Sequence, residues 1–279
     1  MKYRIVSDSS SNLLKMDHNI DYTTVPLKIL IGENSYQDDL NLDVEDLVDK
    51  IEKSESSSTS CPNTQEWMDA FEGADAIFAI TISSNLSGSY NSAMLAKEEF
   101  LQTHPDCKVH VIDSLSTGGD MQLLIEKLAD CIEQNMEFEE IVKEIQAYQE
   151  TTRILFVLES LHNLAKNGRV SHAVANIAGF LGIRFIGKAS EQGTIQQAMV
   201  AKGPKRTMSV LISQILKMGY EGGKMRISHC LNYKMAETLK NELLEKFPIA
   251  DIIIDTCGGL CSYYAERGGM IIGFEVVSH

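Results

Sequence analysis

Short apolar runs alternate with segments of helical periodicity through the first half of the chain. Runs typical of buried strands stand at 3–6, 76–82 and 108–113. Apolar residues at helical spacing follow in 122–134 and 138–149. Strands that alternate with helices in this way predict a parallel sheet with helical crossovers.

The first 60 residues contain three further predicted segments. The run 24–31 predicts another strand, with Pro26 placing its start at an edge or a bend. The period changes to that of a helix after Asn41, where acidic side chains in the first turn favour the helix dipole. The segment Ser54–Ser60 is a polar, serine-rich stretch, which predicts a loop.

The second half mixes its elements differently. A strand signal reopens at 153–161, and the two runs that flank 190–193 indicate a hairpin. Pro204 stands where the first turn of a helix tolerates proline. Further strand-like runs occupy 225–230, 250–255 and 270–277. The chain therefore predicts two α/β domains, an N-terminal parallel-sheet domain at 1–152 and a C-terminal mixed-sheet domain at 153–279.

The composition and net charge of the chain argue against some classes of binding partner. The 279 residues are 44% hydrophobic and 23% charged, with a formal net charge of -14. An acidic surface repels phosphate backbones and anionic lipids, which argues against nucleic-acid binding and stable membrane insertion. No apolar run approaches the ~20 residues of a membrane span. The six cysteines form no CxxC pair and have no histidine at ligand spacing, so we expect reduced thiols, a cytoplasmic location, and neither metal nor cofactor.

A serine-rich turn follows the strand run at 76–82 and precedes a predicted helix. Ser83, Ser84, Asn85, Ser87 and Ser89 supply more hydrogen-bonding groups than a simple turn needs. The turn lacks the first glycine of a hydrolase elbow, and the chain has no P-loop or GxGxxG motif. A helix N-terminus with added hydroxyls forms a pocket for a carboxylate or phosphate. The alternative is that Ser84 or Ser87 only caps the helix.

Six sequence strings in a fixed order resemble the DegV family, the fatty-acid-binding proteins that present a ligand to bacterial fatty acid kinase. These strings are VSDSSSNL at 6–13, VPLKI with YQDD at 25–39, TSCPN at 59–63, ISSNLSGSYNSA at 82–93, VIDSLSTGGDMQLLI at 111–125 and LHNLAKNGRVSHAVANIAGFLGI at 161–183. The resemblance covers nearly the whole chain. It implies two α/β domains with one long-chain fatty acid buried between them.

The resemblance also implies a set of carboxylate-binding residues. Thr59 and Ser87 match the family residues that hydrogen-bond the carboxylate, and Arg169 matches an arginine that would lend the pocket positive charge. The neighbours expected to share this role are Ser60, Ser84, Asn85 and Gly88. Many members also use a histidine before a GPG-like turn. The corresponding segment here, 257–273, contains no histidine, so Ser262 or Tyr263 would at most substitute.

The sequence therefore predicts a carrier without catalysis of its own, whose ligand a fatty acid kinase ATP-binding subunit phosphorylates to an acyl-phosphate. Residues 173–183, which are small and apolar on nearly every side, would form part of the tunnel wall or an ordinary buried helix. A basic cluster of Lys202, Lys205 and Arg206 would dock the kinase subunit or be a solvated helix start. The alternatives are an enzyme acting on a small phosphorylated or carboxylated metabolite at the serine-rich turn, and a carrier of another apolar anion.

Overall fold

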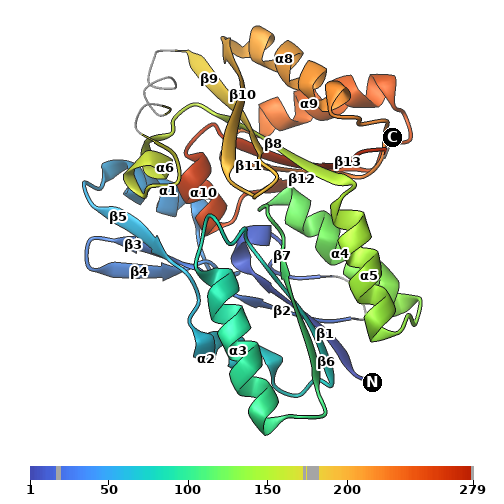
Figure 1. Ribbon diagram of the computed structural model, residues 1–279. Helices are drawn as coiled ribbons and strands as arrows, with labels where there is room; N and C mark the ends of the chain where they lie inside the picture. The colour runs from blue at the N-terminus through green and yellow to red at the C-terminus, as the bar shows by residue number, and fades with distance from the viewer. Residues whose placement is uncertain (17–19, 172–173, 175–181, 278–279) are drawn as a thin grey trace.

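The computed structural model describes residues 1–16, 20–171, 174 and 182–277, which fold into three β-sheets with helices around them (Figure 1). The N-terminal sheet has the strand order β2-β1-β6-β7, and all of its strand pairs are parallel. Its strands are β1 (Tyr3–Asp8), β2 (Asp21–Val25), β6 (Ala76–Thr81) and β7 (Lys108–Asp113). The parallel N-terminal sheet predicted from the sequence is confirmed.

Helices cover both faces of the N-terminal sheet, which explains why β6 is apolar along its length. Ile77 and Ala79 pack against α2 (Thr64–Phe71) and α3 (Ser89–Thr103). Phe78 and Ile80 point the other way, toward α4 (Gly119–Glu133) and α5 (Phe138–Gln149). A strand buried on both faces carries an unbroken apolar run, because successive side chains alternate between the faces.

The C-terminal sheet is mixed, as predicted. Its order is β10-β9-β8-β13-β11-β12, with antiparallel pairs throughout except for the parallel pair of β11 and β12. The strands are β8 (Thr152–Leu158), β9 (Ile183–Ala189), β10 (Ile195–Lys202), β11 (Met225–His229), β12 (Ile252–Thr256) and β13 (Met270–Glu275). The predicted hairpin is the β9–β10 pair.

The two faces of the C-terminal sheet have different partners. Leu155 and Val157 of β8 pack against α8 (Pro204–Lys217) and α9 (Tyr233–Lys246). Phe156 and the other alternate residues of β8 point to the opposite face, which is the one directed toward the N-terminal sheet (Figure 1). That second face is therefore available to line a site between the two sheets.

Helix α4 lies between the two large sheets and contacts both. Two glycines permit this close approach. A Cβ atom on Gly119 would lie 2.2 Å from the carbonyl oxygen of Arg226, and one on Gly273 would lie 2.1 Å from the amide nitrogen of Asp120. Both distances are too short for a side chain, so the helix and strand meet backbone to backbone.

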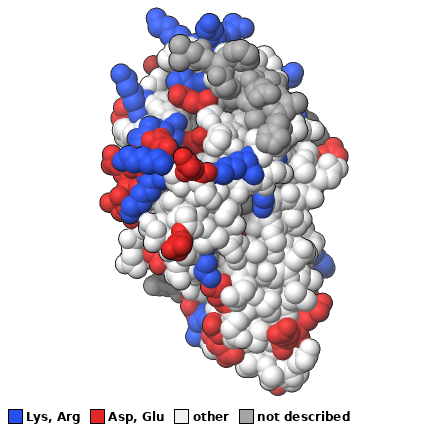
Figure 2. Space-filling view, turned by 90° about the vertical axis from the view of Figure 1, so that its left-hand side faces the viewer, with Lys and Arg blue, Asp and Glu red and all other residues white. Residues whose placement is uncertain are grey.

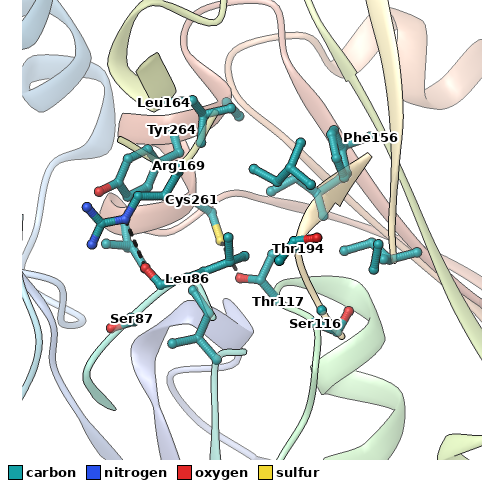
Figure 3. Close-up of a pocket in the computed structure, with 18 of the residues that line it drawn as sticks. Leu86, Ser87, Ser116, Thr117, Phe156, Leu164, Arg169, Thr194, Cys261 and Tyr264 are labelled. Carbon is teal, nitrogen blue, oxygen red and sulfur yellow. Dashed lines mark hydrogen bonds between the residues drawn. The ribbon is translucent and has the colours of Figure 1, made fainter. Parts of the chain in front are cut away.

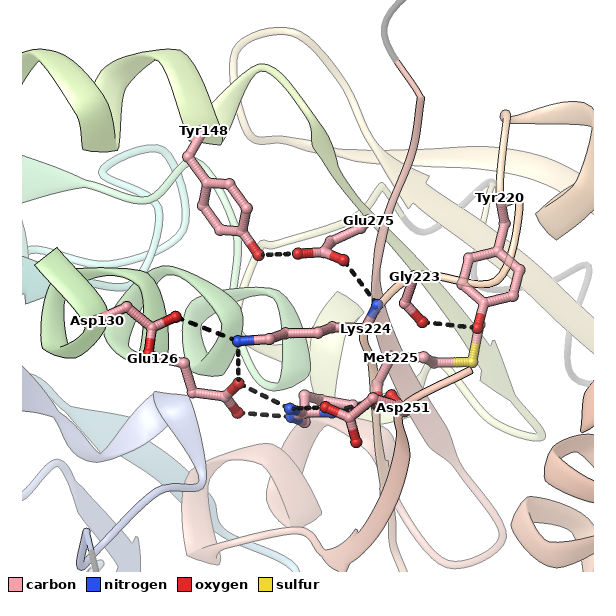
Figure 4. A network of polar contacts seen from close by, with 10 residues as sticks. Glu126, Asp130, Tyr148, Tyr220, Gly223, Lys224, Met225, Asp251 and Glu275 are labelled. Atoms are coloured by element: carbon pink, nitrogen blue, oxygen red, sulfur yellow. Dashed lines mark hydrogen bonds and ion pairs between the residues drawn. The ribbon is translucent and has the colours of Figure 1, made fainter. Parts of the chain in front are cut away.

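A network of charges joins α4 to the C-terminal sheet (Figure 4). Arg226, whose side chain is almost fully buried, binds both carboxylate oxygens of Glu126 at 2.6 and 2.7 Å. The same guanidinium binds Asp251 at 2.7 Å, and Lys224 lies 3.4 Å from Glu126. Because each buried charge has an opposite partner, the network holds the two halves together without leaving an unpaired ion.

A third, antiparallel sheet has the order β4-β3-β5 and was not foreseen. Its strands are β3 (Lys28–Ile31), β4 (Asn34–Gln37) and β5 (Ser57–Ser60). The prediction of a loop at Ser54–Ser60 is thus wrong for its last four residues, which pair with β3 and have side chains that are buried or half-buried. The predicted strand 24–31 is likewise divided between β2 and β3.

Short helices complete this region. Helix α1 (Val44–Lys53) matches the helical pattern after Asn41, and α10 (Gly259–Ala265) packs against α1, β3 and α6 (His162–Lys166). A helix from the end of the chain thus lies among elements of its first half. The division at 152/153 stays a prediction. Within the described ranges, no helix has the length and apolar character needed to cross a membrane.

Surface charges of both signs intermingle over part of the face that carries α1, beside a wide uncharged area (Figure 2). Lys50 pairs with Asp46 on α1, and Arg267 pairs with Asp49 and Glu52. These pairs neutralise one another locally, so the described residues around α1 form no large basic field of the kind that binds nucleic acid.

Candidate functional site

A cavity of ≈ 310 Å³ lies between the N-terminal and C-terminal sheets. From the first half of the chain it receives β5 and the turns that follow β6 and β7, at the carboxyl ends of parallel strands. From the second half it receives β8, the β9–β10 hairpin, α10 and β13. Its apolar wall includes Ile154, Phe156, Leu158, Leu164, Ile195 and Ile271. The carboxyl edge of a parallel sheet is where ligands of open α/β folds bind.

One end of the cavity holds its charged lining residue, Arg169, and we call this end the mouth. It consists of Thr59, Ser60, Ser87, Gly88 and Arg169, all of which line the cavity. Gly88 and Arg169 are exposed, so this end meets solvent. Figure 3 shows Ser87 and Arg169 on one side of the cavity and Phe156 on the other. The structure therefore brings together five of the residues that the resemblance singled out.

Ser84 and Asn85 do not line the cavity. The side-chain amide of Asn85 donates to the carbonyl oxygen of Gln192 at 2.8 Å, and the hydroxyl of Ser83 donates to the carbonyl oxygen of Gly193 at 2.9 Å. Gln192 and Gly193 form the tip of the β9–β10 hairpin. These two side chains of the serine-rich turn thus fasten the hairpin over the cavity.

The remaining groups of the turn attach it to its own sheet. The backbone amide of Ser84 donates to Asp113 Oδ1 at 3.1 Å, and the Ser89 hydroxyl donates to Asp8 Oδ2 at 2.6 Å. Asp8 is fully buried and also accepts the backbone amide of Ile82 at 2.9 Å. Burial raises the pKa of Asp8, and hydrogen bonds from serine hydroxyls and backbone amides act in the opposite direction. The surplus of polar groups in the turn is therefore mostly structural.

The N-terminus of α3 adds positive potential to the mouth. Gly88 is the N-cap residue, and no side chain caps the helix there. The hydroxyl oxygen of Ser87 accepts the backbone amide of Ser89 at 3.3 Å. The first-turn amides and the helix dipole favour an anion next to Gly88 and Ser87.

Arg169 is the one charged side chain among the described residues that line the cavity. Its Nε donates to the carbonyl oxygen of Leu86 at 2.9 Å (Figure 3). The guanidinium also donates to the carbonyl oxygen of Asn167. Both acceptors are neutral carbonyls. The charge of Arg169 is therefore held in place at the mouth by neutral partners, which suits an anionic ligand.

A second buried carboxylate positions the C-terminal side of the cavity. Asp38 accepts the backbone amides of Gly259 at 2.5 Å and Leu260 at 2.9 Å, which are the first residues of α10. Burial raises the pKa of Asp38 to about 6, although these two hydrogen bonds act in the opposite direction. The YQDD string thus anchors the helix that carries Leu260, Cys261 and Tyr264 into the cavity wall.

Comparison with known proteins places this site in a family. The family model described as "Uncharacterised protein, DegV family" matches residues 2–276. The chain belongs to the DegV family. A DegV domain-containing protein of Streptococcus pneumoniae is 42% identical over 280 residues, which span 99% of this chain and 100% of that protein.

Solved DegV-family structures share the whole fold. The Streptococcus pneumoniae Fatty Acid Kinase (Fak) B3 protein, loaded with linoleic acid, has a TM-score of 0.97 and 42% identity. A DegV family protein from Eubacterium eligens, loaded with heptadecanoic acid, has a TM-score of 0.96 and 41% identity. In both comparisons 99% of this chain and 100% of the other chain are covered.

Sequence reasoning about this DegV-family chain missed Tyr264, which lines the cavity. The two candidates to replace the histidine of other DegV members point elsewhere. The Tyr263 hydroxyl lies 3.1 Å from Ser57 Oγ, and Ser262 donates to the carbonyl oxygen of Cys257. Successive helical residues point about 100° apart, so only the placement of α10 decides which one of the three faces the cavity.

Three smaller polar residues of the cavity wall were also missed, namely Ser116, Thr117 and Thr194. The VIDSLSTGGDMQLLI string marked the region of the first two, but nothing in the sequence distinguished inward from outward positions. Residues 173–183, for which the sequence left open a tunnel wall or an ordinary buried helix, lie outside the described residues except for 174, 182 and 183.

Proposed function

We propose that this DegV-family chain binds a long-chain fatty acid in the cavity, with the carboxylate at the mouth and the tail along the apolar wall. The observation that carries the proposal is the position of charge in a cavity whose other described polar lining side chains are neutral. Arg169, the single charged lining residue of the described chain, stands at one end beside Thr59 and Ser87, while β8 and its neighbours supply aliphatic and aromatic side chains. The fatty acids in the two related structures support the same assignment.

The mouth offers donors for a carboxylate. We assign the hydroxyls of Thr59 and Ser87 to its two oxygens, with Arg169 and the first amides of α3 supplying positive potential. Ser60 lines the same end, and Gly88 leaves room for the backbone to approach. We assign Ser84 and Asn85, which lie outside the cavity wall, to the support of the turn.

The tail supplies most of the affinity. Each buried CH₂ contributes roughly 0.8 kcal/mol, so a chain of about sixteen carbons gains on the order of 10 kcal/mol before ordering costs. One charge-assisted hydrogen bond contributes roughly 1.5 to 3 kcal/mol. The apolar wall therefore sets affinity, and the mouth sets the direction in which the ligand lies.

In this proposal the protein presents its ligand and performs no chemistry itself. The exposed mouth lets a fatty acid kinase ATP-binding subunit reach the carboxylate and phosphorylate it to an acyl-phosphate. Lys202, Lys205 and Arg206 lie at the end of β10 and the start of α8, the helix on the sheet face away from the cavity. Docking of the kinase on this cluster stays a prediction. Charge reversal of the three residues, followed by a binding assay with the kinase subunit, would test it.

A small phosphorylated or carboxylated metabolite fits this cavity less well. Such a ligand would occupy the mouth but leave the apolar wall in contact with water, at a cost proportional to the exposed area. No observation on the described residues favours it over a fatty acid.

Mass spectrometry tests the proposed function directly. Protein purified without detergent and examined under native conditions should carry a co-purifying fatty acid, and delipidated protein should take up oleate or palmitate at one molecule per chain. Protein that is recovered empty, and that then binds neither acid, would contradict the proposal. Turnover of a small phosphorylated metabolite by the isolated chain, abolished in Ser87→Ala, would favour the enzymatic alternative.

A further inference from the structure

Tyr264 and Thr59 meet across the cavity wall although 205 positions separate them in the sequence. The Tyr264 hydroxyl lies 2.7 Å from Thr59 Oγ1, and both residues line the cavity. Thr59 belongs to β5 and Tyr264 to α10, so two independent elements position the pair. Figure 3 shows Tyr264 beside Arg169, on the side of the cavity where Ser87 lies.

Which of the two hydroxyls donates depends on where Thr59 directs its single proton. Each hydroxyl has one proton to donate and lone pairs to accept with. If Thr59 donates its proton to a carboxylate, its oxygen is free to accept from Tyr264. Burial raises the pKa of Tyr264, with Thr59 and the Arg169 charge acting in the opposite direction, so the phenol stays protonated at neutral pH. Tyr264 is then the donor and Thr59 the acceptor.

We propose that Tyr264 is a positioning residue of the head-group site, which acts through Thr59. By donating to Thr59 Oγ1, it holds the threonine hydroxyl in one orientation and polarises it as a donor to the carboxylate. This inference rests on the proposed function, because it requires an anion at the mouth. In this proposal Tyr264 and Thr59 together take the place of the head-group histidine that this sequence lacks, with Tyr264 contacting Thr59 and Thr59 contacting the carboxylate.

The surroundings of Tyr264 keep its ring fixed. Its ring packs edge-on against Tyr263, with centroids 4.9 Å apart and an interplanar angle of 88°. Asp38 holds the first turn of α10 through the amides of Gly259 and Leu260. A donor whose ring and helix are both anchored loses little conformational entropy when the ligand binds, so its hydrogen bond is available at full strength.

Two adjacent tyrosines give a matched pair of variants. Tyr264→Phe removes only the hydroxyl that reaches Thr59, while Tyr263→Phe removes a hydroxyl that contacts Ser57 and Asn167 and does not line the cavity. Delipidated proteins would be titrated with oleate and with methyl oleate, which keeps the tail and lacks the charge. Thr59→Val and the double variant with Tyr264→Phe complete a double-mutant cycle.

We expect Tyr264→Phe to weaken oleate binding by about tenfold and methyl oleate binding by less than about twofold, since hydrogen bonds to charged groups are the stronger class. Tyr263→Phe should leave both affinities within about twofold of the parent protein. The double variant should bind oleate no more weakly than Thr59→Val alone, because Tyr264 acts only through Thr59. Far-ultraviolet circular dichroism and the melting temperature establish that each variant is folded.

Three results would overturn the inference. Oleate affinity unchanged in Tyr264→Phe would show that the phenol has no role in ligand binding. Equal losses for oleate and methyl oleate would indicate a packing role, and additive losses in the double variant would mean that Tyr264 acts independently of Thr59. Failure of the parent protein to bind either ligand would instead contradict the proposed function, so the two failures are distinguishable.

Discussion

Arg226 on β11 holds Glu126 on α4 by a two-point ion pair, with Nε–Oε1 and Nη2–Oε2 distances of 2.6 and 2.7 Å. The guanidinium is almost fully buried, and the carboxylate is one-fifth exposed. This pair joins the helix between the two large sheets to the second of them. The ion pair therefore helps to fix the positions of the two sheets on either side of the cavity.

Replacing the arginine should destabilise the fold more than replacing a surface charge. Arg226→Leu leaves Glu126 partly buried without its main partner, which we expect to lower the free energy of unfolding by about 2 kcal/mol, less than for a fully buried pair because Glu126 has some access to water. Urea denaturation measures the change. Lys50→Ala, which breaks an exposed pair with Asp46, is the control and should have no measurable effect. Equal stabilities of the two variants would contradict this role of Arg226.

Asp38 should make stability fall as the pH rises from 4 to 6. Its folded pKa of about 6 lies above its usual value near 3.8, so in this window the folded protein binds more protons than the unfolded chain. The contribution of this group therefore decreases through the window, by on the order of 3 kcal/mol, and is constant above it. The negative charge of the buried Asp8 carboxylate also raises the pKa of Asp38.

The pH dependence of unfolding in Asp38→Asn tests this assignment. Relative to the parent protein, the variant should become progressively more stable between pH 4 and pH 6, because it has no proton to lose at this position. Urea denaturation at several pH values gives the difference. Asp39→Asn, at the neighbouring half-buried position, is the control. A difference between parent and Asp38→Asn that stays constant with pH would show that Asp38 does not titrate in this range.

Ser83 should stabilise the tip of the β9–β10 hairpin. In Ser83→Ala the carbonyl oxygen of Gly193 loses its partner, at a cost of about 1 kcal/mol. Amide hydrogen exchange across 190–194 should become faster, since the hairpin tip opens more often. Ser54→Ala, which removes a turn hydroxyl between α1 and β5 that does not contact the hairpin, should leave that exchange unchanged. Unaltered exchange in Ser83→Ala would argue against the attachment.

Arg169 should matter for the charge of the ligand and not for its tail. In Arg169→Gln we expect oleate affinity to fall by about tenfold and methyl oleate affinity to change by less than about twofold. Arg184→Gln is a matched control, because that guanidinium pairs with Glu159 at 2.5 Å and does not line the cavity. Displacement of a fluorescent fatty acid measures both ligands. A loss of the same size in the control would assign the effect to net charge.

Much of the fold followed from local patterns. The strand at 76–81 and the helix at 138–149 could be predicted without tertiary information. A strand buried on both faces leaves a continuous apolar run, whereas a helix with one buried face leaves apolar residues three or four positions apart. Ser57–Ser60 escaped prediction for the opposite reason. Four small polar residues become a strand only because β3 offers them hydrogen-bonding partners.

The candidate site divides in the same way. Reasoning from residue types suggested an anion pocket only at the serine-rich turn, and the resemblance that spans the chain added Thr59, Ser87 and Arg169 as the carboxylate-binding residues. The actual placement separated Ser87, which lines the cavity, from Asn85, which holds the hairpin. Both residues belong to the same serine-rich turn, and only the position of the β9–β10 hairpin distinguishes their roles.

By itself the sequence determined most of the strands and helices of the two large sheets and where hydroxyl groups gather, because these depend on residue type and on spacing along the chain. Only the tertiary structure decided that Tyr264, and not Tyr263, meets Thr59. That contact depends on the rotation of α10 about its axis. Buried hydrogen bonds from its first amides to Asp38, far away in the sequence, hold the helix in place.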